Sequence, residues 1–250
     1  MAPSPQKVVI LGATSAIAEA AARHWASDGA IIHLAARKAA QTADIAADLR
    51  IRGARAASFQ VADLGNEALQ PEVVDTALRA LEGPPDIVVV AWGTLPDQEL
   101  LLHDPVAAGD ALRVNFVSAA QYVLRFADVM RRQGHGAILV IGSVAGDIGR
   151  AKNFVYGAAK GGLEVFCEGA RRRFRADGVR VIVVKPGLVD TPMTAHLSKH
   201  AMFASAPQVG RRVYEAAWKA NGPVYAPAWW RLVMTALRVM PRRVMDRVNI

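Results

Sequence analysis

Short runs of hydrophobic residues alternate with longer, alanine-rich segments along most of the chain. Each run is nearly continuous instead of alternating with polar residues, a pattern typical of strands that are buried on both faces of a parallel sheet. The runs predict strands over residues 8–11, 31–35, 57–61, 87–91, 138–141 and 179–184. The segments between them have the period of helices. Strands that alternate with helices predict an α/β fold with a doubly wound parallel sheet.

The last third of the chain predicts a helix over 206–221, a short strand near 224–226 and an amphipathic helix over 228–240. Ligands of doubly wound sheets bind at the carboxyl ends of the strands, so the residues that follow each run are the candidates for function. A chain of 250 residues can form one domain around one such sheet. We therefore expect a single domain over residues 1–226 and a basic amphipathic tail over residues 227–250.

Composition is typical of a folded protein from a reducing compartment. Hydrophobic residues make up 52% of the chain and charged residues 21%, which is too apolar for a disordered protein. Cys167 is the one cysteine, so no internal disulfide can form. Residues 1–7 lack the apolar run of a signal peptide, and no apolar stretch of about 18 residues could span a membrane. We expect a cytoplasmic protein, and we predict no metal site.

Gly12 follows the first predicted strand and opens the segment Gly-Ala-Thr-Ser-Ala-Ile-Ala. A glycine there lets the chain turn sharply, so that the amides at the start of the next helix face a pyrophosphate. This is the phosphate-binding turn of a Rossmann fold that binds a dinucleotide. A turn that binds nothing is the alternative. The predicted cofactor contacts in this turn are Gly12, Thr14, Ser15, Ala16 and Ile17.

The second predicted strand ends in Ala35-Ala36-Arg37-Lys38 and carries no acidic residue. An acidic side chain at this corner binds the ribose 2′-hydroxyl of NADH, whereas a guanidinium suits the 2′-phosphate of NADPH. Arg37 therefore favours NADP(H) as the cofactor. Because a solvated arginine in a turn would look the same in the sequence, NAD(H) stays open as the alternative.

Tyr156 and Lys160 stand four residues apart in a predicted helix, which places both side chains on one face. A tyrosine titrates near pH 10, and a lysine cation close to it stabilises the phenolate and lowers that pKa. The tyrosine can then protonate a carbonyl oxygen as a hydride arrives from a nicotinamide. Ser143, shortly after the strand 138–141, is placed to share the hydrogen bonds of that oxygen.

The order of these motifs resembles the short-chain dehydrogenase/reductase family over residues 7 to 226. The resemblance implies an NAD(P)-dependent enzyme that interconverts an alcohol and a carbonyl, and it makes Asn115 a fourth catalytic residue. It implies a homo-oligomer as well. Two departures are Ala16 and Ala18 in place of family glycines, and Ala91-Trp92-Gly93 in place of Asn-Ala-Gly. The further cofactor contacts that it implies are Asp63, Leu64, Ala91, Gly93, Tyr156, Lys160, Pro186, Gly187, Val189 and Thr191.

Segments 151–157 and 191–197, and the tail from residue 226, resemble a narrower group, the decaprenylphosphoryl-2-keto-erythropentose reductases of arabinan precursor synthesis. This resemblance implies a 2-keto pentose joined through phosphate to a polyprenyl chain as the substrate. It also implies a partner oxidase that makes the keto sugar. Arg150 and Lys152 would then meet the phosphate, and His196 the sugar hydroxyls. Solvated loop charges are the alternative at all three positions.

The predicted helix over 228–240 combines an apolar face with basic residues. We assign Trp229, Leu232, Val233, Ala236, Leu237 and Met240 to that face, and place Trp230, Arg231 and Arg238 off it. Beyond residue 223 the chain carries five arginines and one acidic residue, half of its net charge of +8. Tryptophans beside arginines are typical of a helix on anionic lipids, here the inner face of the cell membrane. A helix that packs on its own domain or in a dimer interface is the alternative.

Two rival functions stay open. The first is a reductase of another ketone or lipid-like carbonyl, in which the tail covers the substrate or builds an oligomer. The second is a subunit that binds cofactor without catalysis, as a sensor or scaffold, which Ala16 and Ala18 suggest. Nucleic-acid binding is disfavoured, because the arginines of the tail are interleaved with an apolar helix face.

Overall fold

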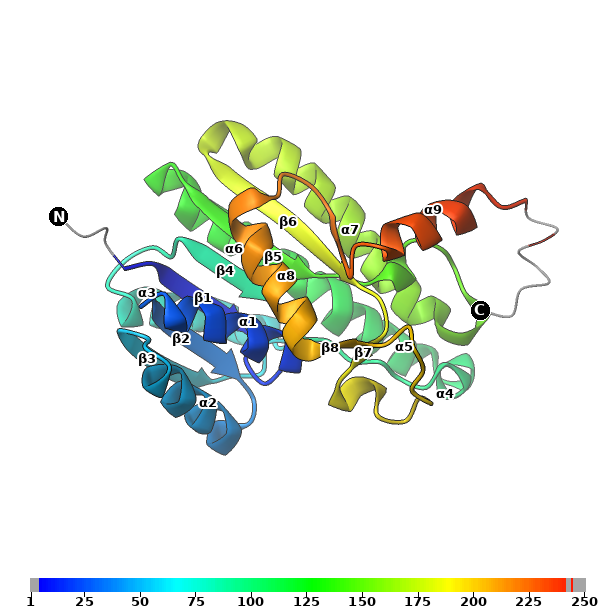
Figure 1. Cartoon of the computed structure of the whole chain (residues 1–250), viewed down its shortest axis with the longest axis horizontal. Coiled ribbons are helices and arrows are strands. Elements are labelled where there is room, and N and C mark those ends of the chain that lie inside the picture. The colour runs from blue at the N-terminus through cyan, green and yellow to red at the C-terminus, as the bar shows by residue number, and fades with distance from the viewer. Residues whose placement is uncertain (1–4, 242–243, 245–250) are drawn as a thin grey trace.

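A parallel sheet runs through the centre of the molecule (Figure 1). The structure is a computed structural model that describes residues 5–241 and 244. Within these residues the sheet has seven strands in the order β3-β2-β1-β4-β5-β6-β9. They are β1 (Lys7–Leu11), β2 (Ile31–Ala36), β3 (Ala56–Val61), β4 (Ile87–Val90), β5 (Gly136–Ile141), β6 (Val179–Pro186) and β9 (Val224–Ala226). All six hydrophobic runs are strands of this sheet, so the predicted doubly wound α/β fold is confirmed.

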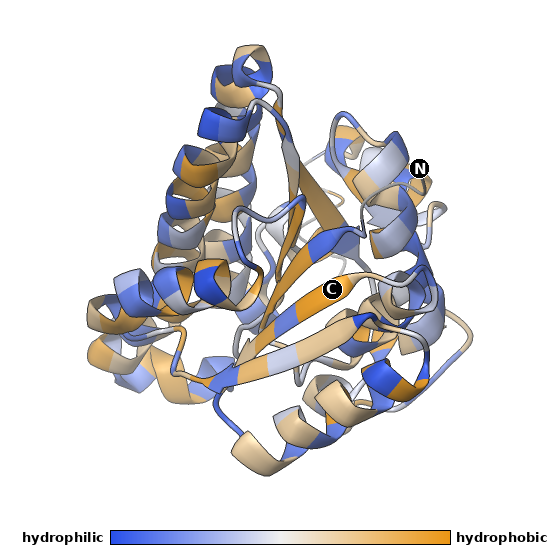
Figure 2. Cartoon of the chain, turned by 90° about the vertical axis from the view of Figure 1, so that its left-hand side faces the viewer, coloured by the Kyte–Doolittle hydropathy of each residue, from blue (hydrophilic) through white to orange (hydrophobic). Residues whose placement is uncertain are grey.

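Helices cover both faces of the sheet, and each face has its own hydrophobic core. Because successive strand residues point to opposite faces, Val8 and Ile10 belong to one core and Val9 and Leu11 to the other. Figure 2 shows the mostly hydrophobic strands between the two helical layers. One layer consists of α1 (Ala16–Ser27), α2 (Ala39–Ile51) and α8 (Ala206–Lys219). The other consists of α3 (Gln70–Ala80), α6 (Ser118–Gln133) and α7 (Phe154–Phe174).

Small residues bring α1 and α8 close together. A Cβ atom at Gly210 on α8 would lie 2.6 Å from the Cβ atom of Ala20 and 2.8 Å from the amide nitrogen of Ala21. A larger side chain at position 210 would therefore push α8 away from α1. This contact fixes the helix that precedes β9 and, through β9, the position of the C-terminal helix.

The remaining elements gather at the carboxyl ends of the strands, on the right of Figure 1. Two of them, the paired strands β7 and β8, were not predicted from the sequence, because each has two residues and no recognisable period. The elements at this end of the sheet are α4 (Gln98–His103), α5 (Pro105–Leu112), a π-helical turn (Arg113–Val117), β7 (Val189–Asp190), β8 (Ala204–Ser205) and α9 (Trp230–Val239). Short 3-10 turns span Glu67–Leu69, Val144–Gly146, Ala151–Asn153, Arg175–Asp177 and Pro192–Thr194.

The C-terminal helix α9 packs on its own domain, which is the alternative that the sequence left open. Trp230 is only 5% exposed and Met234 is fully buried, whereas Trp229, Leu232 and Val239 are exposed. Trp230, which the sequence places off the apolar face, is thus the residue that packs inward, whereas Trp229 and Leu232 of that face are exposed. Since α9 carries apolar residues on two sides, the sequence period could not tell which side packs inward. Among the described residues, none of the helices is both long and apolar enough to cross a bilayer.

Candidate active site

The candidate residues after each strand lie together at the carboxyl end of the sheet. Gly12 follows β1, Arg37 follows β2, Asp63 follows β3, Ser143 follows β5 and Pro186 ends β6. Because all strand pairs of the sheet are parallel, these ends are neighbours in the order of the sheet. The fold therefore assembles one site from segments that are far apart in the sequence.

The turn after β1 fits a dinucleotide. Gly12 has a φ of +84°, and a Cβ atom there would lie 2.8 Å from backbone atoms of Ala91 and Trp92. Only glycine combines that conformation with so close an approach. Helix α1 begins at Ala16, and its N-cap residue Ser15 makes no side-chain hydrogen bond to the first amides of the helix. Those amides are available to an anion, so this turn can hold a pyrophosphate.

The other predicted cofactor contacts surround this turn. Arg37 and Lys38 are exposed at the end of β2. The Asp63 carboxylate accepts a hydrogen bond of 3.0 Å from the Gly65 amide, while Leu64 and Ala91 are buried. At the end of β6, Pro186 and Gly187 lead into β7, which begins at Val189, and Thr191 caps the next 3-10 turn. Their positions are compatible with cofactor binding.

The loop after β5 lies directly on α7, and this contact brings Ser143 to Tyr156. A Cβ atom at Gly146 would lie 2.7 Å from the amide nitrogen of Gly161, and one at Gly157 would lie 2.9 Å from the Ala145 carbonyl oxygen. The glycines on this side of α7 thus allow backbone to touch backbone. Ser143 accepts a hydrogen bond of 3.1 Å from the Ala145 amide, which fixes its hydroxyl beside the helix.

Tyr156 and Lys160 lie side by side on α7, as their spacing predicted. The Lys160 Nζ atom is 5.8 Å from the centroid of the Tyr156 ring and donates a hydrogen bond of 3.1 Å to the Ile141 carbonyl oxygen. Burial lowers the pKa of Lys160 to about 8. The predicted lowering of the Tyr156 pKa by Lys160 is wrong, because burial raises that pKa and only a hydrogen bond with Ser143 acts against the rise. A phenol that stays protonated beside an ammonium group can serve as a general acid.

Asn115 is buried in the π-helical turn that interrupts the helix between α5 and α6. Its Oδ1 atom accepts from the Thr94 amide at 3.0 Å, and its Nδ2 atom donates to the Ala111 carbonyl oxygen at 2.9 Å. A Cβ atom at Gly93 would lie 2.5 Å from Asn115 Oδ1 and 3.7 Å from Lys160 Nζ. Gly93, Asn115 and Lys160 are therefore neighbours, so the structure brings the four predicted catalytic residues into one region.

A model of the short chain dehydrogenase family matches residues 6–201. The chain belongs to this family. Its NAD(P)-dependent dehydrogenase or reductase class follows from that membership, which disfavours the rival reading of a non-catalytic subunit. This short-chain dehydrogenase also shares the family fold with levodione reductase, whose crystal structure aligns with a TM-score of 0.80 at 20% identity over 90% of this chain and 97% of that one.

Two curated relatives match nearly the whole of this short-chain dehydrogenase. An uncharacterized oxidoreductase in the mprA 5′ region of Streptomyces coelicolor is 33% identical over 248 residues, which are 98% of this chain and 96% of the relative. An uncharacterized oxidoreductase of Mycobacterium tuberculosis is 34% identical over 241 residues, 96% of each chain. The crystal structure of a putative betaketoacyl-ACP reductase has a TM-score of 0.76 at 26% identity over 89% of this chain and 96% of that one.

Helix α9 of this dehydrogenase covers the loops that flank the candidate catalytic residues. Trp230 and Met234 pack with Val144, Ile148 and Leu188 in one hydrophobic cluster. A Cβ atom at Gly187 would lie 1.8 Å from the Trp230 Nε1 atom, so the indole ring rests directly on Gly187, one of the predicted cofactor contacts. Sequence reasoning missed Trp230, because the sequence does not show which helix face is buried.

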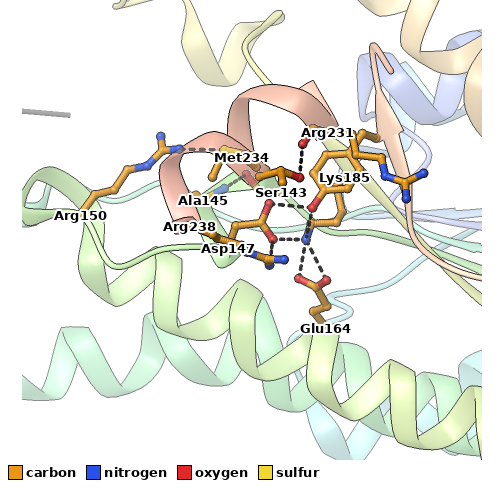
Figure 3. Close-up of polar contacts among 11 residues, drawn as sticks. Ser143, Ala145, Asp147, Arg150, Glu164, Lys185, Arg231, Met234 and Arg238 are labelled. Atoms are coloured by element: carbon orange, nitrogen blue, oxygen red, sulfur yellow. Dashed lines mark hydrogen bonds and ion pairs between the residues drawn. The ribbon is translucent and has the colours of Figure 1, made fainter. Parts of the chain in front are cut away.

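A buried network of charges ties α9 to the site (Figure 3). Lys185, at the end of β6, contacts Asp147 and donates to both carboxylate oxygens of Glu164 on α7, at 2.7 and 2.8 Å. Arg238 on α9 donates to Asp147 at 2.5 Å, and the Tyr225 hydroxyl donates to it at 3.1 Å. No motif in the sequence marks this network. The one available signal was a lysine that directly follows the hydrophobic run 179–184.

The predicted substrate residues lie near α9 and on the β7–β8 segment. Arg150 is half-buried, its Nη2 atom lies 3.7 Å from the Met234 sulfur atom, and burial lowers its pKa (Figure 3). Lys152 and His196 are exposed. Arg150 thus belongs to the contact between the Ser143 loop and α9.

Proposed function

We propose that this enzyme reduces a ketone with Tyr156 as the general acid. The bound nicotinamide supplies the hydride. Tyr156 gives its proton to the carbonyl oxygen as that oxygen becomes negative, and the Ser143 hydroxyl donates a hydrogen bond to the same oxygen. The Lys160 cation stabilises the phenolate that is left, and Asn115 holds the backbone at Thr94 beside Lys160. Burial raises the pKa of Tyr156, so the phenol carries the proton that reduction consumes.

NADPH is the proposed cofactor. Arg37 and Lys38 are exposed where the adenosine ribose would lie, and the turn 35–38 carries no carboxylate to bind a ribose 2′-hydroxyl. A guanidinium can instead make paired, charge-assisted hydrogen bonds with a 2′-phosphate.

The proposed substrate is a ketone with an apolar, lipid-like body. The observation that carries this proposal is the hydrophobic cluster of Val144, Ile148, Leu188, Trp230 and Met234, which joins α9 to both loops beside Tyr156. Ile148 and Leu188 are only partly buried at the edge of this cluster, so an apolar substrate that covers them leaves water, and each buried methylene contributes about 0.8 kcal/mol. A short polar ketone gains nothing there.

One candidate of this class is the polyprenylphosphoryl 2-keto pentose that the sequence resemblance suggests. Its polyprenyl chain suits the apolar cluster, and Arg150, Lys152 and His196 are the side chains proposed for its phosphate and sugar. A partner oxidase would supply the keto group. The names of the Streptomyces and Mycobacterium relatives state no substrate. This substrate is therefore proposed from segments 151–157 and 191–197 and from the apolar residues of α9.

A series of methyl ketones of increasing chain length tests the substrate class through the oxidation of NADPH. We expect kcat/KM to rise by about fourfold for each added methylene until the exposed edge of the cluster is covered. Trp230→Ala should flatten this dependence, whereas the matched control Trp229→Ala, an exposed tryptophan next to it, should keep it. Equal kcat/KM along the series would contradict the proposal, as would activity that survives in Tyr156→Phe.

The same assay with NADH in place of NADPH tests the cofactor. We expect a preference for NADPH of at least about tenfold, and Arg37→Ser should abolish it because the charge-assisted bond to the phosphate is lost. Arg55→Ser is the matched control, since Arg55 is an exposed arginine before β3, at the opposite end of the sheet. A wild-type enzyme that prefers NADH would overturn this part of the proposal.

A further inference from the structure

Two polar side chains beside the first turn of α7 each bury an atom that has no hydrogen-bond partner among the described residues. These atoms are Gln98 Nε2, a donor, and Asn153 Oδ1, an acceptor. A buried polar atom without a partner is costly, and native proteins leave few of them unpaired. A donor and an acceptor of this kind near one catalytic tyrosine point to a ligand that uses both.

Gln98 is held in one orientation. Its side chain is 5% exposed, and its Oε1 atom accepts a hydrogen bond of 3.0 Å from the Val155 amide. That bond uses the carbonyl end of the side chain to cap α7 and leaves the NH₂ group as the unpaired end. Helices α4, α5 and α7 meet in a small cluster of Leu101, Ala111 and Val155, which fixes α4 and therefore Gln98. Gln98 Nε2 is thus a donor in a fixed position beside Val155, the residue that precedes Tyr156.

Asn153 stands at the N-cap position of α7 but does not cap the helix with its side chain. Its Oδ1 atom is buried and remains available as an acceptor. The side chain of Tyr156 leans toward the same end of α7, because Cα–Cβ bonds in a helix tilt toward its N-terminus. The Tyr156 phenol, the Gln98 donor and the Asn153 acceptor therefore all lie at the N-terminal end of α7.

A hydroxyl group is the simplest partner for such a pair, because it accepts one hydrogen bond while it donates another. A carbonyl oxygen can only accept, and an ammonium group can only donate. We propose that Gln98 and Asn153 bind a hydroxyl group of the substrate close to the carbonyl that Tyr156 protonates. The substrate class is then a hydroxyketone with an apolar body. This inference rests on the carbonyl reduction proposed above and adds a second polar attachment that orients the carbonyl.

A pair of ketones that differ in one hydroxyl group tests this assignment: 1-hydroxy-2-dodecanone and 2-dodecanone. The wild-type enzyme should prefer the hydroxyketone by about 100-fold in kcat/KM, mainly through KM. Gln98→Glu keeps an oxygen for the Val155 amide but removes the donor, and Asn153→Leu removes the acceptor at similar volume. Each should reduce the preference to below about tenfold. Gln133→Met is the control, since Gln133 bonds to the Pro85 and His135 carbonyl oxygens at the other end of the sheet.

Dissociation constants for both ketones, from tryptophan fluorescence, are measured in parallel and should show the same preference. Equal affinity of the wild-type enzyme for the two ketones would overturn the inference, as would variants that keep the wild-type ratio. If neither ketone is turned over, the carbonyl-reduction proposal fails, and the fluorescence ratios then decide the hydroxyl site by themselves. Turnover of 2-dodecanone equal to that of the hydroxyketone would keep the reductase and reject the hydroxyl site.

Discussion

Lys160 has an unusual environment for a cation, since its Nζ atom bonds to a backbone carbonyl and no carboxylate of the described residues forms an ion pair with it. Burial without an opposite charge lowers its pKa to about 8, well below the ordinary value of 10.5. The residue is therefore charged at neutral pH but close to losing its proton. The proposed acid catalysis depends on whether Lys160 keeps this proton.

The rate of carbonyl reduction should accordingly fall above pH 8. Below that pH the Lys160 cation stabilises the phenolate that forms on Tyr156, and above it the neutral amine does not. Tyr156 itself stays protonated over this range, because burial raises its pKa. Initial rates of NADPH oxidation at low ketone concentration give kcat/KM, which should drop about tenfold per pH unit above the pKa of Lys160. A profile that is flat to pH 10 would show that the cation is not needed.

Spacing in the sequence was enough to find the reactive pair but not its surroundings. Tyr156 and Lys160 are four residues apart, and helical geometry alone puts them on one face. Gln98 and Lys185 reach the same region from other elements, so no local pattern marks them. Whether a polar atom is buried without a partner depends on contacts across the whole fold, and such atoms become visible only in three dimensions.

At the scale of elements, the buried cation of Lys185 joins the parts that carry the candidate site. Asp147 lies in the loop after β5, Glu164 on α7 and Arg238 on α9, and all three belong to the network around it (Figure 3). Two cations and two carboxylates balance in charge, which is what a buried site requires. Removal of one member would leave an uncompensated charge inside the protein.

Lys185→Met should destabilise the fold by about 3–5 kcal/mol, because Asp147 and Glu164 would lose their buried cation. Urea denaturation followed by circular dichroism measures the change. The matched control is Lys199→Met, which removes an exposed ion pair of 2.7 Å with Asp190 and should change stability by less than about 1 kcal/mol. Similar losses for both variants would mean that the buried network contributes no more than a surface ion pair.

Elements with one buried side were harder to predict than elements buried on both. The sheet strands were found because β1, β4, β5 and β6 are covered on both faces and are apolar at nearly every position. Helix α9 was predicted too, but not which of its sides packs on the domain. Its inner residues Trp230 and Met234 and its outer residue Leu232 are all apolar, so hydropathy alone cannot distinguish its two sides.

At the scale of the whole molecule, positive charge and exposed apolar surface meet at the C-terminal helix. The chain has a net charge of +8, and α9 lies at the carboxyl end of the sheet with its outer side open (Figure 1). Leu232 is 76% exposed and Val239 is 77% exposed, and Arg231, next to Leu232 in the sequence, is exposed as well. Arg242, Arg243 and Arg247, part of the predicted membrane tail, lie outside the described residues. A lipid-bound ketone would approach the site from this side.

The outer side of α9 should therefore bind anionic lipid surfaces. We expect the full chain to sediment with vesicles of phosphatidylglycerol and phosphatidylcholine but not with phosphatidylcholine alone, because arginines add attraction to apolar insertion. Leu232→Gln with Val239→Gln should lower the bound fraction at least about tenfold. Ile51→Gln with Val165→Gln removes two apolar residues of 86% and 71% exposure elsewhere and should leave binding unchanged. Equal loss in both double variants would reject a specific role for α9, and no wild-type binding would reject the membrane proposal altogether.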